Sequence, residues 1–182
     1  YRVRALLGKG GCGAVWLADD LHLDRPVALK SIRPTRNSAA AAADLAMLRQ
    51  EARVLARLRH PNLVGVHAWR TAGTDHYLIM DYIAGGSFES RLARTGPLSW
   101  ADAARHVADA SEALAVVHGH GIVHRDIKPA NLLWDSDRDE AVLADFGIAI
   151  LTDGPQAPAG TPDYMAPEVY SGAAVPASDV YA

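Results

Sequence analysis

Four polar side chains in the second half of the chain have the types and spacing that one reaction needs. The segment HRDIKPAN places Asp126, Lys128 and Asn131 within six residues, and the later segment DFG adds Asp145. Transfer of a phosphoryl group requires a carboxylate to receive the acceptor's proton, a metal clamp, and positive charge beside the phosphates. These four residues together meet those requirements.

A lysine in the first half of the chain extends this set. The segment VALK places Lys30 among apolar neighbours in a predicted strand, where an ammonium group needs a partner. Glu51, on the helix predicted over residues 38–59, is the candidate partner. A surface salt bridge would contribute only about 0–1 kcal/mol, and the apolar strand around Lys30 argues against that interpretation.

The segment GKGGCGAVW, residues 8–16, contains a G-x-G-x-x-G pattern. Alone this pattern is weak, because glycines gather in many turns that require positive φ. A dinucleotide-binding fingerprint needs a strand, the glycine turn and then a helix. Here the glycines lead into a second predicted strand, so we expect a hairpin that covers a ligand.

The elements that must position these residues fall into two groups. Residues 1–83 are predicted as a five-stranded antiparallel unit that carries the helix of residues 38–59. The predicted strands cover residues 1–7, 14–20, 25–32, 63–69 and 76–83.

The pattern becomes helical after a glycine-rich joint at residues 84–87. Ser99 is the predicted N-cap of a long helix from Trp100 to about His118. A short strand is predicted over residues 141–147. Residues 84–182 are therefore expected to be mainly helical.

Composition excludes several classes of function. The 182 residues are 49% hydrophobic and carry a net charge of −3, with an isoelectric point near 6.2. This balance gives no electrostatic basis for binding nucleic acid or an anionic membrane. The single cysteine excludes an intrachain disulfide, and no apolar run approaches the roughly 20 residues that span a bilayer. The chain starts inside a strand pattern and stops inside SDVYA, so we expect it to be a piece of a longer protein.

In sequence order, the motifs GKGGCGAV, VALK, HRDIKPAN, DFG and GTPDYMAPE resemble those of the protein kinase catalytic domain. The chain is most similar to bacterial Ser/Thr kinases of the eukaryotic (Hanks) type. The resemblance implies a two-lobed α+β fold, with an N-lobe at residues 1–83 and a C-lobe at residues 84–182. The C-lobe would be truncated after the start of the helix that follows the Ala-Pro-Glu motif.

The resemblance also implies the reaction: transfer of the γ-phosphoryl group of ATP, with Mg²⁺, to Ser/Thr hydroxyls of protein substrates. Asp126 would be the catalytic base, and Asn131 and Asp145 would hold Mg²⁺. The implied catalytic set is Lys30, Glu51, Asp126, Lys128 and Thr161. The implied ATP-binding set is Gly8, Lys9, Gly10, Gly11, Gly13, Val15, Ala28, Lys30, Met80, Asp81, Ile83 and Leu133, with Met80 as gatekeeper.

The sequence departs from the family pattern in the activation loop and at its end. Thr152 is the only hydroxyl residue among residues 147–159, and Ala157 stands where many kinases carry an activating phosphothreonine. We therefore expect no phosphorylation switch at that place, and Thr152 remains the candidate for phosphorylation of the loop. The arginine that usually pairs with Glu168 would lie beyond Ala182, which predicts an unpaired Glu168 and an inactive or unstable fragment. Asp179 resembles the aspartate that anchors the catalytic loop.

The residues present argue against two other functions. A pseudokinase-like nucleotide-binding or scaffold module would be expected to lack Lys30, Asp126 or Asp145, yet all three are present. A small-molecule kinase of the aminoglycoside type would lack Lys128 and the segment GTPDYMAPE. The pattern His118, His120 and His124 suggests a metal site, but we expect these histidines to be structural.

We expect protein substrates, no nucleic-acid partner and a homodimer for autophosphorylation. The kinase domain is expected in the cytoplasm, with any membrane anchor elsewhere in the parent chain. Cys12, at the tip of the glycine-rich hairpin, is expected to cover the phosphates without a part in the chemistry.

Overall fold

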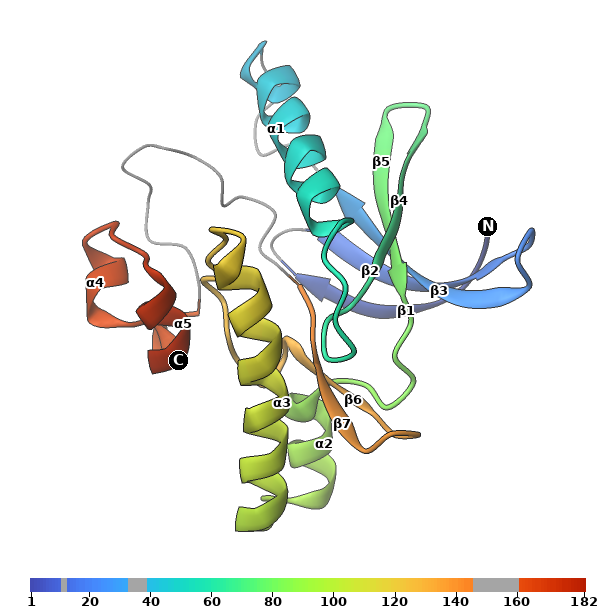
Figure 1. Cartoon of the computed structure of the whole chain (residues 1–182). Coiled ribbons are helices and arrows are strands. Elements are labelled where there is room, and N and C mark those ends of the chain that lie inside the picture. Colours follow the sequence, from blue (N-terminus) through green and yellow to red (C-terminus); the bar gives the residue numbers. More distant parts are fainter. Residues whose placement is uncertain (11–12, 33–38, 146–160) are drawn as a thin grey trace. The chain divides into compact units, whose positions relative to one another are not determined.

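The computed structural model describes residues 1–10, 13–32, 39–145 and 161–182, with the side chains of 39–44, 47 and 51 left out of the description. The described residues form two compact units (Figure 1). Tyr1–Arg59 and Gly65–Tyr82 make up unit 1, and His60–Val64 and Ile83–Ala182 make up unit 2.

Unit 1 is an antiparallel sheet with strand order β1-β2-β3-β5-β4, as the sequence predicted. The strands are β1 (Arg2–Gly10), β2 (Gly13–Asp20), β3 (Arg25–Ile32), β4 (Val66–Ala72) and β5 (Asp75–Asp81), and the helix is α1 (Ala39–Leu55). The central strand β3 pairs with β2 on one side and β5 on the other. Its residues Val27, Ala28 and Leu29 are buried, which explains their apolar character.

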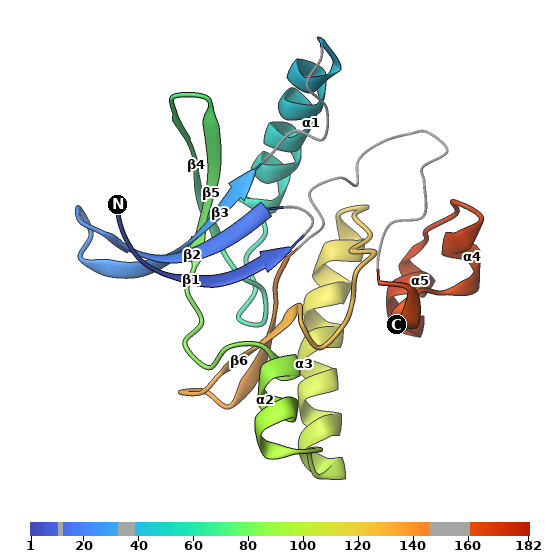
Figure 2. The same cartoon turned by 180° about the vertical axis from the view of Figure 1, so that it is seen from behind.

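Unit 2 is built around a long helix, α3 (Trp100–Gly119), with the shorter helix α2 (Phe88–Thr95) beside it (Figures 1 and 2). The Phe88 ring of α2 lies 4.9 Å from the His106 ring of α3, measured between ring centroids. Ser99 caps α3 as predicted, because its side chain accepts the backbone N–H of Asp102 at 3.1 Å. The remaining elements are β6 (Leu132–Asp135), β7 (Glu140–Leu143), the 3₁₀ turn η1 (Pro162–Tyr164), α4 (Pro167–Tyr170) and α5 (Pro176–Tyr181).

Several predicted boundaries were wrong. The helix predicted over residues 38–59 ends at Leu55, and the strand predicted from Leu63 begins at Val66. The strand begins later because residues 62–64 bond to β7 instead: Val64 N–H donates to Leu143 O (2.9 Å), and Leu143 N–H donates to Asn62 O (2.8 Å). The chain after Leu55 continues in turn bonds, with Arg57 N–H donating to Val54 O at 3.0 Å.

Two elements were absent from the prediction. Helix α2 directly follows the glycine-rich joint, and its signal was Ser87, whose side chain caps it by accepting Ser90 N–H at 3.2 Å. Strand β6 pairs with β7, which covers residues 140–143 rather than 141–147. No helix within the described ranges has the length and apolar character needed to cross a membrane.

Candidate active site

The carboxylate of Asp126, the predicted base, has three polar side chains around it in unit 2. Lys128 Nζ lies 2.7 Å from Asp126 Oδ2, and Asn131 Nδ2 donates to the same oxygen at 2.8 Å. Thr161 Oγ1 donates to Asp126 Oδ1 at 2.9 Å and accepts from Lys128 Nζ at 2.6 Å. The four side chains thus form one closed polar cluster.

Two opposing effects act on the pKa of Asp126. Burial raises the pKa, while the hydrogen bonds from Lys128, Thr161 and Asn131 and the charge of Lys128 lower it. The lowering effects prevail, so the pKa lies below the ordinary value for an aspartate. The carboxylate is therefore ionised at neutral pH and able to accept hydrogen bonds.

His124 fixes the backbone of Asp126 from inside the unit. It is fully buried, its Nε2 donates to Ala144 O at 2.9 Å, and its Nδ1 accepts the backbone N–H of Asp126 at 3.3 Å. One nitrogen donating and the other accepting requires the neutral ring. Burial lowers the pKa of His124, and this outweighs the raising effects of the Ala144 carbonyl and nearby carboxylates.

Asp179, from α5, binds the same segment from its other side. The buried carboxylate accepts the backbone N–H groups of His124 and Arg125, each at 2.7 Å. His118 Nε2 donates to it as well, at 2.7 Å. Arg125 has φ +67°, a conformation that costs energy in a residue with a long side chain.

The two predicted metal ligands leave the same end of the β6–β7 hairpin. Leu132 pairs with Leu143 as the last residues of the hairpin, and Ala144 N–H donates to Asn131 O at 2.9 Å. Asn131 therefore directly precedes β6, and Asp145 follows Ala144 on the neighbouring chain segment. Asp145 has φ +59°, a left-handed conformation that Asp tolerates better than most residues.

The residues around this hairpin end fit a Mg²⁺ site that is completed by phosphates. Mg²⁺ is commonly bound by one or two protein oxygen ligands together with water and substrate phosphates. No group of three or more His, Cys, Asp or Glu suited to a metal occurs among the residues that the structure describes. His118, His120 and His124 bond to three different acceptors: Asp179, Val116 O and Ala144 O.

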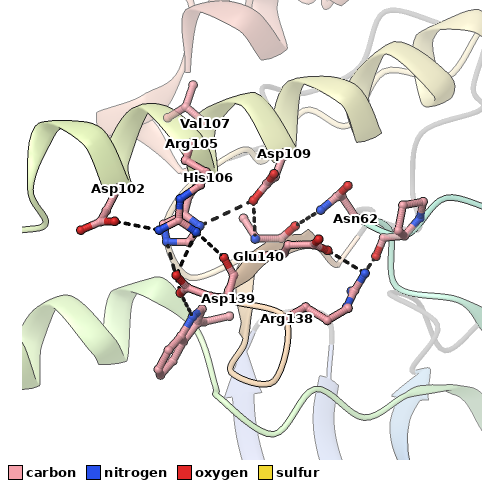
Figure 3. A network of polar contacts seen from close by, with 12 residues as sticks. Asn62, Asp102, Arg105, His106, Val107, Asp109, Arg138, Asp139 and Glu140 are labelled. Atoms are coloured by element: carbon pink, nitrogen blue, oxygen red, sulfur yellow. Dashed lines mark hydrogen bonds and ion pairs between the residues drawn. The ribbon is translucent and has the colours of Figure 1, made fainter.

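The closed end of the β6–β7 hairpin is bound to α3 by a polar network (Figure 3). Arg105 donates to Asp139 O at 2.6 Å and lies 2.9 Å from Asp139 Oδ2. Trp134 Nε1 donates to Asp139 Oδ1 at 2.9 Å, and Asp109 accepts the backbone N–H of Ala141 at 2.9 Å. The network holds the hairpin at the end opposite the predicted metal ligands.

Unit 1 holds most of the remaining predicted residues. Lys30 lies in β3 and is only 4% exposed, beside the buried residues Ala28 and Met80, which are paired across β3 and β5. Lys30 is paired with Val15 of β2. Glu51 lies in α1, but its side chain is outside the described residues, so the Lys30–Glu51 pair stays a prediction.

The glycine-rich segment joins β1 and β2, as expected for a hairpin. Gly8 and Lys9 pair with Val15 and Ala14, and Gly10 pairs with Gly13. Gly11 and Cys12 lie outside the described residues. Gly13 has φ +132°, and a Cβ there would lie 2.2 Å from Ser31 O, whereas a Cβ on Gly8 would meet nothing within 4 Å.

The side chain of Asp81 has a role that the sequence did not reveal. Its Oδ2 accepts Gly65 N–H at 2.9 Å, and its Oδ1 lies 2.7 Å from His67 Nε2. The backbone N–H of Asp81 donates to Gly65 O at 3.0 Å. The Asp81 side chain therefore ties the end of β5 to the start of β4. Ile83 and Leu133 belong to unit 2.

Comparison with known proteins decides the family. The family model of the protein kinase domain matches residues 1–182. The chain belongs to the protein kinase domain family. It is 38% identical to the serine/threonine-protein kinase pkn3 of Myxococcus xanthus, and the match covers the whole chain and 36% of that protein.

Two further kinases show similar identity over the whole chain. It is 37% identical to the serine/threonine-protein kinase PkaB of Streptomyces coelicolor, and 38% identical to the serine/threonine-protein kinase PknA of Mycobacterium tuberculosis. The matches cover 46% and 44% of those proteins. The chain thus spans between about a third and a half of the length of these relatives.

The Ala-Pro-Glu segment of this kinase domain requires one correction. Glu168 was expected to be unpaired, but its Oε1 accepts a hydrogen bond from Ser178 Oγ of α5 at 2.6 Å. This bond and a second one to backbone hold the pKa of Glu168 below its ordinary value. Phe146, Thr152 and Ala157 lie outside the described residues, so the predictions on the activation loop stay predictions.

Proposed function

We propose that this domain transfers the γ-phosphoryl group of ATP to Ser/Thr hydroxyls of protein substrates, with Mg²⁺. The observation that carries the proposal is the cluster of Asp126, Lys128, Asn131 and Thr161. It holds an ionised carboxylate with its oxygens 2.7 to 2.9 Å from a lysine, an amide and a hydroxyl. The relatives in the comparison are named serine/threonine-protein kinases, which supports the same reaction.

Asp126 is the residue that receives the proton of the acceptor hydroxyl. Little covalent chemistry is required of the protein in this reaction, so orientation of the hydroxyl matters more than strong basicity. Thr161 and Lys128 hold the Asp126 carboxylate in one orientation, and His124 and Asp179 hold the backbone beneath it. Lys128 also supplies positive charge next to the position of the transferred group, the feature that favours Ser/Thr over Tyr acceptors.

The residues that the family resemblance assigns to ATP binding hold the nucleotide in this proposal. Asn131 and Asp145 would hold Mg²⁺, which would supply positive charge to neutralise the phosphates. Lys30, oriented by Glu51, binds the α- and β-phosphates, and the backbone of the glycine-rich hairpin covers them. The backbone of Asp81 and Ile83 binds adenine next to Met80, with Val15, Ala28 and Leu133 packing on the ring.

We also propose the substrates, the oligomeric state and the cellular location of the domain. The substrates are proteins, and a homodimer provides autophosphorylation in trans. We place the domain in the cytoplasm, where ATP is abundant and Cys12 remains a thiol. A membrane anchor elsewhere in the parent protein is compatible with this placement.

The test is an assay of the intact protein with radiolabelled ATP and a generic basic protein substrate. Label transfer is expected with Mg²⁺ and none with a chelator. Lys30→Met is expected to reduce turnover by at least about a hundredfold, as for loss of a group that stabilises transition-state charge. ATP binding without transfer under all conditions would instead support the pseudokinase-like binding module.

A further inference from the structure

The side chain of Ser31 bonds to the backbone of the glycine-rich hairpin at two points. Ser31 Oγ accepts the backbone N–H of Ala14 at 2.8 Å and donates to the backbone carbonyl of Ala14 at 3.1 Å. Both atoms belong to one residue of β2, so a single hydroxyl satisfies its donor and its acceptor. No sequence pattern indicates this arrangement, because a serine next to the predicted phosphate-binding lysine is typical of any strand.

The Ser31–Ala14 bonds lie at the end of the paired part of β2 and β3. The paired register of β2 and β3 runs from Asp20 opposite Arg25 to Val15 opposite Lys30. Ala14 is the next residue of β2, and its polar backbone groups meet the Ser31 hydroxyl where the ladder stops. The hydroxyl thus continues the attachment of β2 to β3 by one residue, toward the turn of the hairpin.

Gly13 also approaches Ser31 closely. A Cβ on Gly13 would lie 2.2 Å from Ser31 O and 2.9 Å from Ser31 Oγ, and its φ of +132° is one that side chains rarely allow. The third glycine of the motif is therefore required by the approach of β3. In contrast, Gly8 has open space where its Cβ would be.

We propose that Ser31 is a positioning residue that fixes the root of the glycine-rich hairpin and thereby sets the affinity for the phosphates of ATP. This inference rests on the proposed function, since it assigns ATP to that hairpin. Ser31 directly follows Lys30 in β3. Strand β3 thus carries both the predicted phosphate-binding ammonium of Lys30 and the hydroxyl that bonds to the glycine-rich hairpin.

The test uses Ser31→Ala, which removes both bonds, and Ser31→Thr, which keeps a hydroxyl in a strand. Thr71→Val is the matched control, because Thr71 Oγ1 bonds to His76 Nδ1 at 3.0 Å in the same sheet, away from the hairpin. Two quantities are measured on the intact protein. They are hydrogen exchange at the Ala14 amide without nucleotide, and the dissociation constants of ATP and adenosine.

Ser31→Ala is expected to speed exchange at Ala14 by about tenfold and to weaken ATP binding by about fivefold, in line with the loss of neutral hydrogen bonds. Adenosine binding should stay unchanged, since adenosine carries no phosphate. Ser31→Thr and Thr71→Val should behave like the wild type in both measurements.

Unchanged exchange and unchanged ATP affinity in Ser31→Ala would overturn the proposal. An equal loss of ATP and adenosine affinity would also overturn it, because the hydroxyl would then support the sheet in general. A wild-type protein that binds no ATP contradicts the proposed function, and exchange at Ala14 then decides on its own whether Ser31 holds the hairpin.

Discussion

The carboxylate of Asp179 lies 2.7 Å from the backbone nitrogen of Arg125, a residue with φ +67°. The same carboxylate accepts the backbone N–H of His124. Asp179 is 3% exposed, so these bonds are shielded from water. A strained backbone directly before the predicted base is therefore held by a residue of α5.

Asp179→Ala is expected to lower the free energy of unfolding by roughly 3 kcal/mol, because two buried N–H groups lose a charged acceptor. It should also reduce kcat in the folded fraction, since the backbone before Asp126 relaxes. Chemical denaturation and steady-state kinetics measure the two effects.

Asp20→Ala is the matched control for Asp179→Ala. Asp20 is also buried, and its Oδ1 accepts the backbone N–H groups of His22 and Leu23 in the β2–β3 turn. Asp20→Ala should cost stability without reducing kcat. Equal kcat in the two variants would show that Asp179 serves stability alone.

Gly8→Ala and Gly13→Ala are expected to separate two roles within one motif. Gly13→Ala should lower stability by about 1–3 kcal/mol, through the contact with Ser31 O and the unfavourable φ. Gly8→Ala meets nothing within 4 Å, so it should leave stability unchanged and weaken ATP binding. Thermal unfolding and nucleotide titration provide the comparison, and an unstable Gly8→Ala protein would contradict it.

The carboxylate of Asp126 gives a pH prediction with a defined sign. Its folded pKa is lowered, burial being outweighed by the bonds from Lys128, Thr161 and Asn131. Its stabilising contribution is then fully present above the unfolded pKa of about 4 and is lost as the pH falls through the lower folded pKa.

The difference in unfolding free energy between the wild type and Asp126→Asn should therefore be constant between about pH 5 and 7. Below about pH 4 the wild type should lose stability relative to Asp126→Asn. Denaturation curves across this range provide the measurement. Thr161→Val, which removes one lowering bond, should move the change to higher pH. A difference that moves the other way on acidification would show that the folded pKa is raised.

Asp81→Ala is expected to raise the KM for ATP by about two- to fivefold with little change in kcat, since the Asp81 bonds to Gly65 and His67 fix the backbone proposed to bind adenine. Asp75→Ala, at the exposed start of the same strand, is the control. An unchanged KM in Asp81→Ala would remove the carboxylate from any role in nucleotide binding.

The sequence predicted the sheet of unit 1 well because local signals determine it. Apolar strand segments joined by short turns are a local signal that predicts antiparallel hairpins. The segment HRDIKPAN also indicated Asp126, Lys128 and Asn131 as one chemical group, and the family resemblance added Thr161. The structure brings these four side chains into direct contact.

Contacts between residues far apart in the sequence were beyond prediction. Residues 62–64 leave unit 1 because β7, about eighty residues later, offers them backbone partners. Ser178 donates a hydrogen bond to Glu168, which was expected to be unpaired. Ser31 bonds to the backbone of Ala14 in β2, and the Asp81 carboxylate bonds to the backbone of Gly65 just before β4. No pattern in the local sequence marks such a partner.

The central claim is that Asp126 serves phosphoryl transfer and not nucleotide binding. The most direct measurement compares the wild type with Asp126→Asn for ATP affinity, for turnover on a protein substrate, and for the phosphorylated residue formed. We predict that the wild type produces phosphoserine or phosphothreonine, and that Asp126→Asn binds ATP within about twofold of the wild type while losing at least about a hundredfold in turnover. Turnover by Asp126→Asn at the wild-type rate would contradict the account.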